Sequence, residues 1–140
     1  MNILVLNAGS SSLKYQLIEM PSKIVKCAGI VERIGMDDAI FTHEKGTKKY
    51  CEVLAIKNHQ EGIKKVASAL MHSTYGVINH VDQIDAVGHR VVHGGSKFKE
   101  TVLVNKQVKD SIRNLFDLAP LHNPPNLTGI DISESIFPDA

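Results

Sequence analysis

Two short stretches of the sequence carry residues that could bind an anion. The first is Asn7–Lys14, in which an amide, a glycine, three serine hydroxyls and an ammonium group directly follow the apolar run 3–6. Gly9 permits a close approach of the backbone, and the hydroxyls and turn N–H groups can donate to a phosphate. The carbonyl oxygen of Asn7 could bind Mg²⁺, and Lys14 adds a positive charge. A phosphate site and a solvated serine-rich hairpin both explain this composition.

The second stretch is Gly88–Gly95, which reads Gly-His-Arg-Val-Val-His-Gly-Gly and ends a predicted buried strand over 83–92. Open α/β sheets bind ligands at such strand ends. Arg90 offers a planar guanidinium that suits a carboxylate or a phosphate, although an ion pair at the strand end would explain it equally well. His89 and His93 could form a zinc pair, but the sequence patterns no third ligand.

Several other apolar runs have the length of strands. The first two runs, 3–6 and 15–18, flank the serine-rich turn and therefore predict a hairpin with the turn at its tip. Gly29 marks a bulge or a close backbone approach in the third run. The polar stretch 43–49 is expected to be a solvated loop with a small basic cluster, across which the last two runs pair. These three later runs are 24–34, 39–42 and 50–54.

Three helices are predicted from capping residues and apolar spacing. Asn58 caps the first helix, with Glu61 three residues on as in a capping box, and Gly76 is its expected stop. Asn105 and Asn123 are the expected caps of the second and third helices. The order strands, helix, strand, helix, helix predicts an α/β fold with a mixed β-sheet flanked by helices.

Length and composition set the general class of the protein. A chain of 140 residues is one domain or part of one, and its net charge of +1 argues against broad nucleic-acid or membrane binding. Cys27 and Cys51 form no C-x-x-C motif, so reduced thiols in the cytoplasm are expected, with a single disulfide as the alternative. No apolar run approaches a membrane span. The side chains of His59, His72 and His80 lack patterned partners and are expected at the surface.

Three stretches together resemble the acetate kinase family of the sugar kinase/Hsp70/actin superfamily: Leu6–Lys14, Gly88–Gly95 and Ala119–Asn126. Their order and separations also match the family. The resemblance implies that residues 1–140 are a ribonuclease H-like amino-terminal domain of a two-domain kinase. It further implies a cytoplasmic enzyme that transfers a phosphoryl group reversibly from ATP to acetate with Mg²⁺, giving acetyl phosphate and ADP, and a homodimer formed mainly through the carboxyl-terminal domain.

The resemblance assigns the opening stretch to the phosphate and nucleotide side of the site. Asn7 matches the asparagine at the Mg²⁺ and phosphate site. Ser10 and Ser12 match the hydroxyls of the first phosphate turn, and Lys14 matches a lysine assigned to ATP. These four residues are therefore the expected metal-binding and nucleotide-binding residues of this chain.

The later two stretches are assigned to the acyl substrate. Arg90 matches the arginine that holds the acyl carboxylate or the phosphoryl group. Val92 and Leu121 match apolar residues around the acetate methyl group, and His122 lies beside them. The family's catalytic aspartate, its transition-state histidine and arginine, and a glutamate metal ligand all lie beyond Ala140, so no catalytic residue is expected in this chain.

These assignments lead to three hypotheses. The first is that the intact protein is an acetate kinase and that the 140-residue chain alone is inactive. The second is that the protein prefers propionate or another short-chain acid. The third is a non-catalytic module that binds phosphate or carboxylate. In the family, a carboxyl-terminal segment returns to complete this domain, so an exposed apolar patch is also expected.

Overall fold

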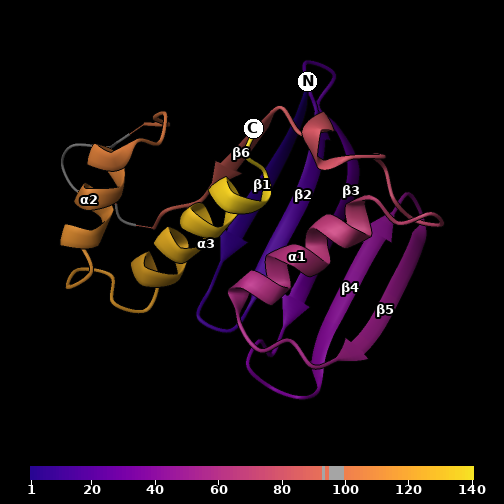
Figure 1. Ribbon diagram of the computed structural model, residues 1–140, viewed down its shortest axis with the longest axis horizontal. Helices are drawn as coiled ribbons and strands as arrows, with labels where there is room; N and C mark the ends of the chain where they lie inside the picture. Colours follow the sequence, from indigo (N-terminus) through magenta and orange to yellow (C-terminus); the bar gives the residue numbers. More distant parts are fainter. Residues whose placement is uncertain (93, 95–99) are drawn as a thin grey trace.

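The structure is a computed structural model that describes residues 1–92, 94 and 100–140. Its centre is a six-stranded mixed sheet with the strand order β5-β4-β3-β2-β1-β6 (Figure 1). The first five strands form an antiparallel meander, and β6 pairs with β1 in parallel. The predicted mixed sheet is therefore confirmed. The strands are β1 Asn2–Ala8, β2 Leu13–Glu19, β3 Ile24–Glu32, β4 Ala39–Lys45, β5 Lys48–Leu54 and β6 Ala86–His89.

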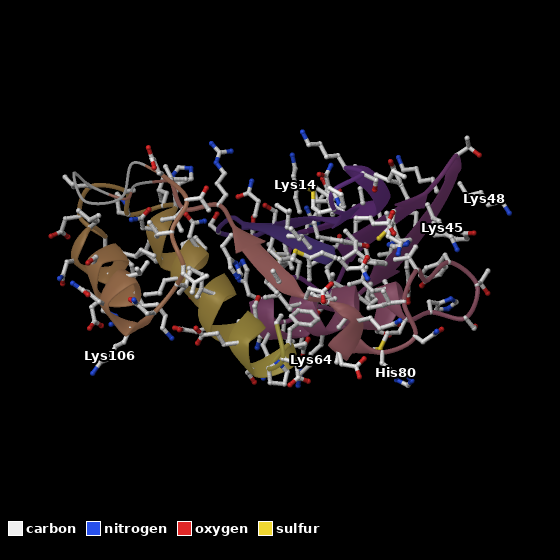
Figure 2. All side chains as sticks on the ribbon, turned by 90° about the horizontal axis from the view of Figure 1, so that it is seen from above. Lys14, Lys45, Lys48, Lys64, His80 and Lys106 are labelled. Carbon is white, nitrogen blue, oxygen red and sulfur yellow. The ribbon has the colours of Figure 1, made fainter. Side chains whose placement is uncertain are left out.

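Alternation of side chains along the strands gives the sheet two unlike faces. In β2, Leu13, Tyr15 and Leu17 are buried, whereas Lys14 and Gln16 between them are exposed. Because successive side chains of a strand point to opposite faces, the period of two places the apolar residues on one face. That face carries the helices, and the opposite face carries Lys14 (Figure 2).

Two strand predictions need correction. The stretch 43–49 is not a loop, because β4 and β5 continue through it and are joined by a tight turn in which Gly46 has a φ of +61°. His43 is consequently buried within β4. At the second stretch, only Ala86–His89 of the predicted strand 83–92 pairs as a strand, and a short 3₁₀ helix, η1 Val81–Gln83, precedes it.

Three α-helices complete the described part of the chain: α1 His59–Leu70, α2 Lys106–Asn114 and α3 Asn123–Ile136. α1 and α3 lie side by side on one face of the sheet, and α2 packs against α3 (Figure 1). None of the described helices combines the length and the apolar character needed to cross a membrane.

The predicted caps hold for two of the helices. The side chain of Asn58 accepts a hydrogen bond from the Glu61 N–H at 2.9 Å, and that of Asn105 accepts from the Val108 N–H at 2.9 Å. α1, however, ends at Leu70, well before the expected stop at Gly76. The third cap is wrong by one residue, because Asn123 is the first helical residue of α3 and is buried.

The main core lies between the sheet and the two helices on it. It contains Leu4, Leu6, Leu13, Leu17, Phe41, Ile63, Val66, Leu70 and Phe137 among others. A smaller cluster joins α2 to α3 and consists of Val108, Ile112, Leu127 and Ile130. Both cysteines are free thiols, Cys27 buried and Cys51 exposed. A groove of about 900 Å³ follows β6, α3 and residues 100–104, and Leu103 in it is 92% exposed.

A buried histidine links three strands of the sheet. The His43 Nε2–H donates to the carbonyl of Tyr75 at 3.1 Å, so Nδ1 is the acceptor for the Tyr15 hydroxyl at 2.5 Å. Tyr15 and His43 lie on β2 and β4, and both are register partners of Gly29 on β3 between them. The hydrogen bond therefore passes over a residue that has no side chain, which agrees with the predicted close approach at Gly29.

Stability is expected to fall when the pH drops below about 6.5. Burial lowers the pKa of His43, so as the pH falls the unfolded chain takes up a proton at its ordinary pKa of about 6.5, before the folded chain does. The urea midpoint should thus be lower at pH 5.5 than at pH 7.5. His43→Gln should reduce this difference, whereas the exposed His80→Gln should leave it unchanged. An equal pH difference in all three proteins would contradict the assignment.

Candidate functional site

The serine-rich stretch forms the tip of the β1–β2 hairpin, as predicted. Its carbonyl groups are turned into the protein. The Ser12 carbonyl accepts from the Gly9 N–H at 2.9 Å, and the Ser11 carbonyl accepts from the Ile34 N–H at 2.9 Å. The Gly9 carbonyl accepts from the His59 ring at 2.6 Å.

The Ala8 carbonyl at the end of β1 is held in the same way, at 2.8 Å from the side-chain amide of Asn126. The carbonyls of Ala8, Gly9, Ser11 and Ser12 are therefore occupied by internal donors. Ser10 and Ser11 are exposed, and their hydroxyls and N–H groups make no hydrogen bond within residues 1–92, 94 and 100–140. A turn with its carbonyls inward and its donors outward is suited to an anion.

Three polar side chains stand in a row beside this turn. Asn7 on β1 is the register partner of Lys14 on β2, so both side chains lie on the face of the sheet away from the helices. On the other side of β1, the Arg90 N–H donates to the Leu6 carbonyl at 3.2 Å, one residue beyond the pair of Leu6 with His89. Because this hydrogen bond continues the β1–β6 ladder by one residue, the Arg90 side chain is expected on the same face as that of Asn7.

The two cations of the row are free to meet a ligand. Lys14 and Arg90 are both exposed, and neither forms an ion pair with another described residue. The sequence left open whether Arg90 serves an ion pair at the strand end, and in the described part of the chain no such pair exists. The row thus presents an amide, an ammonium and a guanidinium next to the donors of the turn.

The residues expected around the acyl group come from two segments, one just after β6 and one just before α3. Val92 is 45% exposed, and its N–H donates to the side-chain oxygen of Asn126 at 3.1 Å. Leu121 is 72% exposed and His122 is exposed, directly before α3. The exposed apolar side chains of Val92 and Leu121 are the kind of surface that a small methyl group would cover.

The structure does not test the possible zinc pair of His89 and His93. Burial lowers the pKa of His89 to about 4, so the ring is neutral at pH 7. It pairs with Leu6, whose side chain is buried on the helix side of the sheet. The second histidine of the pair, His93, lies outside the described residues, and among those described no cluster of three His, Cys, Asp or Glu side chains could hold a metal ion.

The comparison with protein families is decisive for the class of protein. The model of the acetokinase family matches residues 2–140 of the chain. The chain belongs to the acetokinase family. It is 51% identical over 140 residues to the acetate kinase of Symbiobacterium thermophilum, covering 100% of this chain and 35% of that protein.

Solved structures agree with this family assignment. The crystal structure of Porphyromonas gingivalis acetate kinase matches with a TM-score of 0.95 and 38% identity, over 98% of this chain and 35% of that chain. A propionate kinase from Francisella tularensis subsp. tularensis SCHU S4 matches with a TM-score of 0.88 and 33% identity, over 99% and 34%. This acetokinase-family chain therefore has the actin/Hsp70/sugar kinase-type fold, and it spans about a third of the length of its relatives.

Two residues that hold the backbone of this candidate site were missed by sequence reasoning. His59 is half-buried and holds the Gly9 carbonyl, so its prediction as a surface residue is wrong. Asn126 is 2% exposed and contacts Ala8, which is 118 positions away in the sequence. The only signal for Asn126 was its place at the end of the stretch Ala119–Asn126.

Proposed function

We propose that these 140 residues are the amino-terminal part of an acetate kinase, which transfers a phosphoryl group reversibly from ATP to acetate and gives acetyl phosphate and ADP. The observation that carries the proposal is the row of Asn7, Lys14 and Arg90 beside a turn whose carbonyls face inward. Membership of the acetokinase family and the printed names of the relatives support it.

The residues suit a reaction between two anions. Acetate is ionised at neutral pH and needs no general base to become a nucleophile. The task of the protein is to hold the carboxylate and the phosphoryl group in line and to balance their negative charge. Arg90 would hold the carboxylate or the phosphoryl group, and the hydroxyls of Ser10 and Ser12 with Lys14 would hold the nucleotide phosphates. Val92, Leu121 and His122 would surround the acetate methyl group.

Magnesium fits one position of this site. The side-chain oxygen of Asn7 is a hard ligand of the kind that Mg²⁺ takes, and Asn7 is half-buried beside the turn. Asn7 would supply one ligand, and nucleotide phosphates and water supply others, as is usual for this ion. When bound, the ion neutralises charge on the phosphoryl group.

The purified full-length protein is expected to form acetyl phosphate from acetate, ATP and Mg²⁺. The product can be trapped with hydroxylamine and measured as the hydroxamate, with ADP release as a second measurement. The 140-residue chain alone should be inactive, because its residues form one wall of the proposed site. Turnover by the 140-residue chain would contradict the expected inactivity of that chain. A full-length protein that phosphorylates no short-chain acid would contradict the proposed kinase activity.

The same two protein preparations also test two alternative functions, a preference for another acid and a non-catalytic binding module. Propionate as the preferred acid is favoured by the likeness to a propionate kinase, and kcat/KM for acetate, propionate and butyrate decides between them. One methylene group changes the free energy of binding by about 1–3 kcal/mol, so cross-activity is expected. For a non-catalytic binding module, calorimetry with acetyl phosphate would detect binding without turnover. We also propose a cytoplasmic location, consistent with two free thiols, and a homodimer of the full-length enzyme.

A further inference from the structure

One buried amide connects all three sequence stretches of the site. The side chain of Asn126 donates through Nδ2 to the Ala8 carbonyl at 2.8 Å and accepts through Oδ1 from the Val92 N–H at 3.1 Å. Ala8 directly precedes the phosphate turn, and Val92 lies two residues beyond Arg90. Asn126 itself lies in the first turn of α3, five residues after Leu121. The amide thus spans the gap between the phosphate side and the acyl side of the proposed site.

The environment of Asn126 makes these two hydrogen bonds demanding. The residue is 2% exposed, so water cannot readily replace a lost partner. An amide offers one donor group and one acceptor at fixed separation, which matches a carbonyl on one segment and an N–H on the other. Of the side chains of the same shape, leucine has neither group, and an ionised aspartate has no donor for the Ala8 carbonyl.

We propose that Asn126 is a positioning residue that sets the distance between the acyl-binding segment around Arg90–Val92 and the phosphate turn. The expected effect on the reaction rests on the proposed function. The contact between Asn126 and the two segments is independent of it. Through Ala8, the amide fixes the end of β1 from which Asn7 projects. Through Val92, it fixes the chain just after Arg90, at a point where β6 has already ended at His89. The backbone at Val92 is therefore not held by pairing of β6 with β1. It is held by the side chain of Asn126.

The sharpest test is the near-isosteric variant Asn126→Asp in the full-length protein. A protonated carboxyl group can still donate to the Ala8 carbonyl and accept from the Val92 N–H. In a carboxylate, by contrast, an oxygen with no proton faces the Ala8 carbonyl oxygen, and both are acceptors. Burial raises the pKa of such a carboxyl group above its usual value of about 4. The ratio of variant to wild-type kcat/KM for acetate should therefore be near one at low pH. It should fall as the pH rises, by on the order of 100-fold.

The variant Asn126→Ala removes both hydrogen bonds at every pH. Its kcat/KM should be lowered by a similar factor with no added pH dependence, and the loss should lie in kcat more than in the KM for ATP. Hydrogen exchange of the Val92 amide in the ligand-free protein should become faster in Asn126→Ala. This second measurement needs no activity and reports directly on the contact.

A matched control is Ser133→Ala on the same helix. The hydroxyl of Ser133 is also 2% exposed and donates to the Gly129 carbonyl at 2.7 Å within α3, so its loss tests the general effect of a buried polar deletion. Ser133→Ala should leave the kinetics and the exchange of Val92 unchanged. A pH-independent ratio in Asn126→Asp, or unchanged exchange in Asn126→Ala, would overturn the proposal. An inactive wild-type protein would overturn the proposed function instead, and the exchange of Val92 would still decide the role of Asn126.

Discussion

Replacing Arg90 with alanine in the full-length protein is expected to lower kcat/KM for acetate by at least about 100-fold. The exposed guanidinium has no ion-pair partner among the described residues, so its hydrogen bonds are available to an anionic substrate. A hydrogen bond to a charged group contributes about 1.5–3 kcal/mol, and a planar guanidinium can make two. Since 1.4 kcal/mol corresponds to a factor of ten, two such bonds account for the expected loss.

Steady-state kinetics of three variants test this expectation. Arg90→Lys keeps the positive charge but loses the planar fork, so it should recover only part of the activity. Arg113→Ala is the matched control, because Arg113 is an exposed arginine on α2 that pairs with Asp110 at 3.0 Å. An exposed pair of this kind contributes little, and its removal should leave kcat/KM unchanged. If Arg90→Ala behaved like Arg113→Ala, Arg90 would have no part in the reaction.

The second large effect concerns the folded state. Gly29→Ala is expected to lower the free energy of unfolding by about 2–4 kcal/mol, as overpacking and a broken buried hydrogen bond together would do. A Cβ atom at Gly29 would collide with the Tyr15 hydroxyl and with the Thr42 carbonyl. The hydroxyl is the group that bonds His43 across β3, so the added methyl group would separate that pair. Urea unfolding of the two proteins measures the difference.

Gly62→Ala is the same chemical change, but it is expected to raise the free energy of unfolding. Gly62 lies in α1, and a Cβ atom there would meet only side-chain atoms at 3.5–3.9 Å, which is ordinary contact. Alanine favours the helix by up to about 1 kcal/mol over glycine, so Gly62→Ala should stabilise the protein. The double variant Tyr15→Phe with Gly29→Ala should recover at most part of the loss, because the ring edge at position 15 and the Thr42 carbonyl still block the Cβ atom. Destabilisation by both alanines alike would contradict this account of Gly29.

Local pattern was enough to predict much of this fold. Alternation and turn residues predicted the opening hairpin, and the capping residues Asn58 and Asn105 predicted where α1 and α2 begin. Such features depend on neighbours a few residues apart, which the sequence places side by side. The chemistry of the turn was likewise visible in its residue types, and the family resemblance was needed to choose between a phosphate site and a solvated hairpin.

The remaining features depend on contacts between distant residues. His43 was expected in a solvated loop because it stands among lysines, yet Tyr15 and Tyr75 enclose it. His59 was expected at the surface, and only the packing of α1 against the hairpin brings it to Gly9. No spacing rule connects Asn126 to Ala8. Sequence reasoning therefore proposed the side chains that would face a ligand and missed the side chains that hold the backbone behind them.

The contact between Asn126 and Ala8 also has a consequence for biosynthesis. The meander of β1 to β5 uses pairings between adjacent segments and can form while the chain is still growing. Asn126 is synthesised 118 residues after Ala8, whose carbonyl it holds beside the turn. At roughly 5–20 residues per second, that interval lasts several seconds or more. We therefore expect the β1–β2 hairpin to be made well before α3, whose Asn126 then holds the Ala8 carbonyl at its tip.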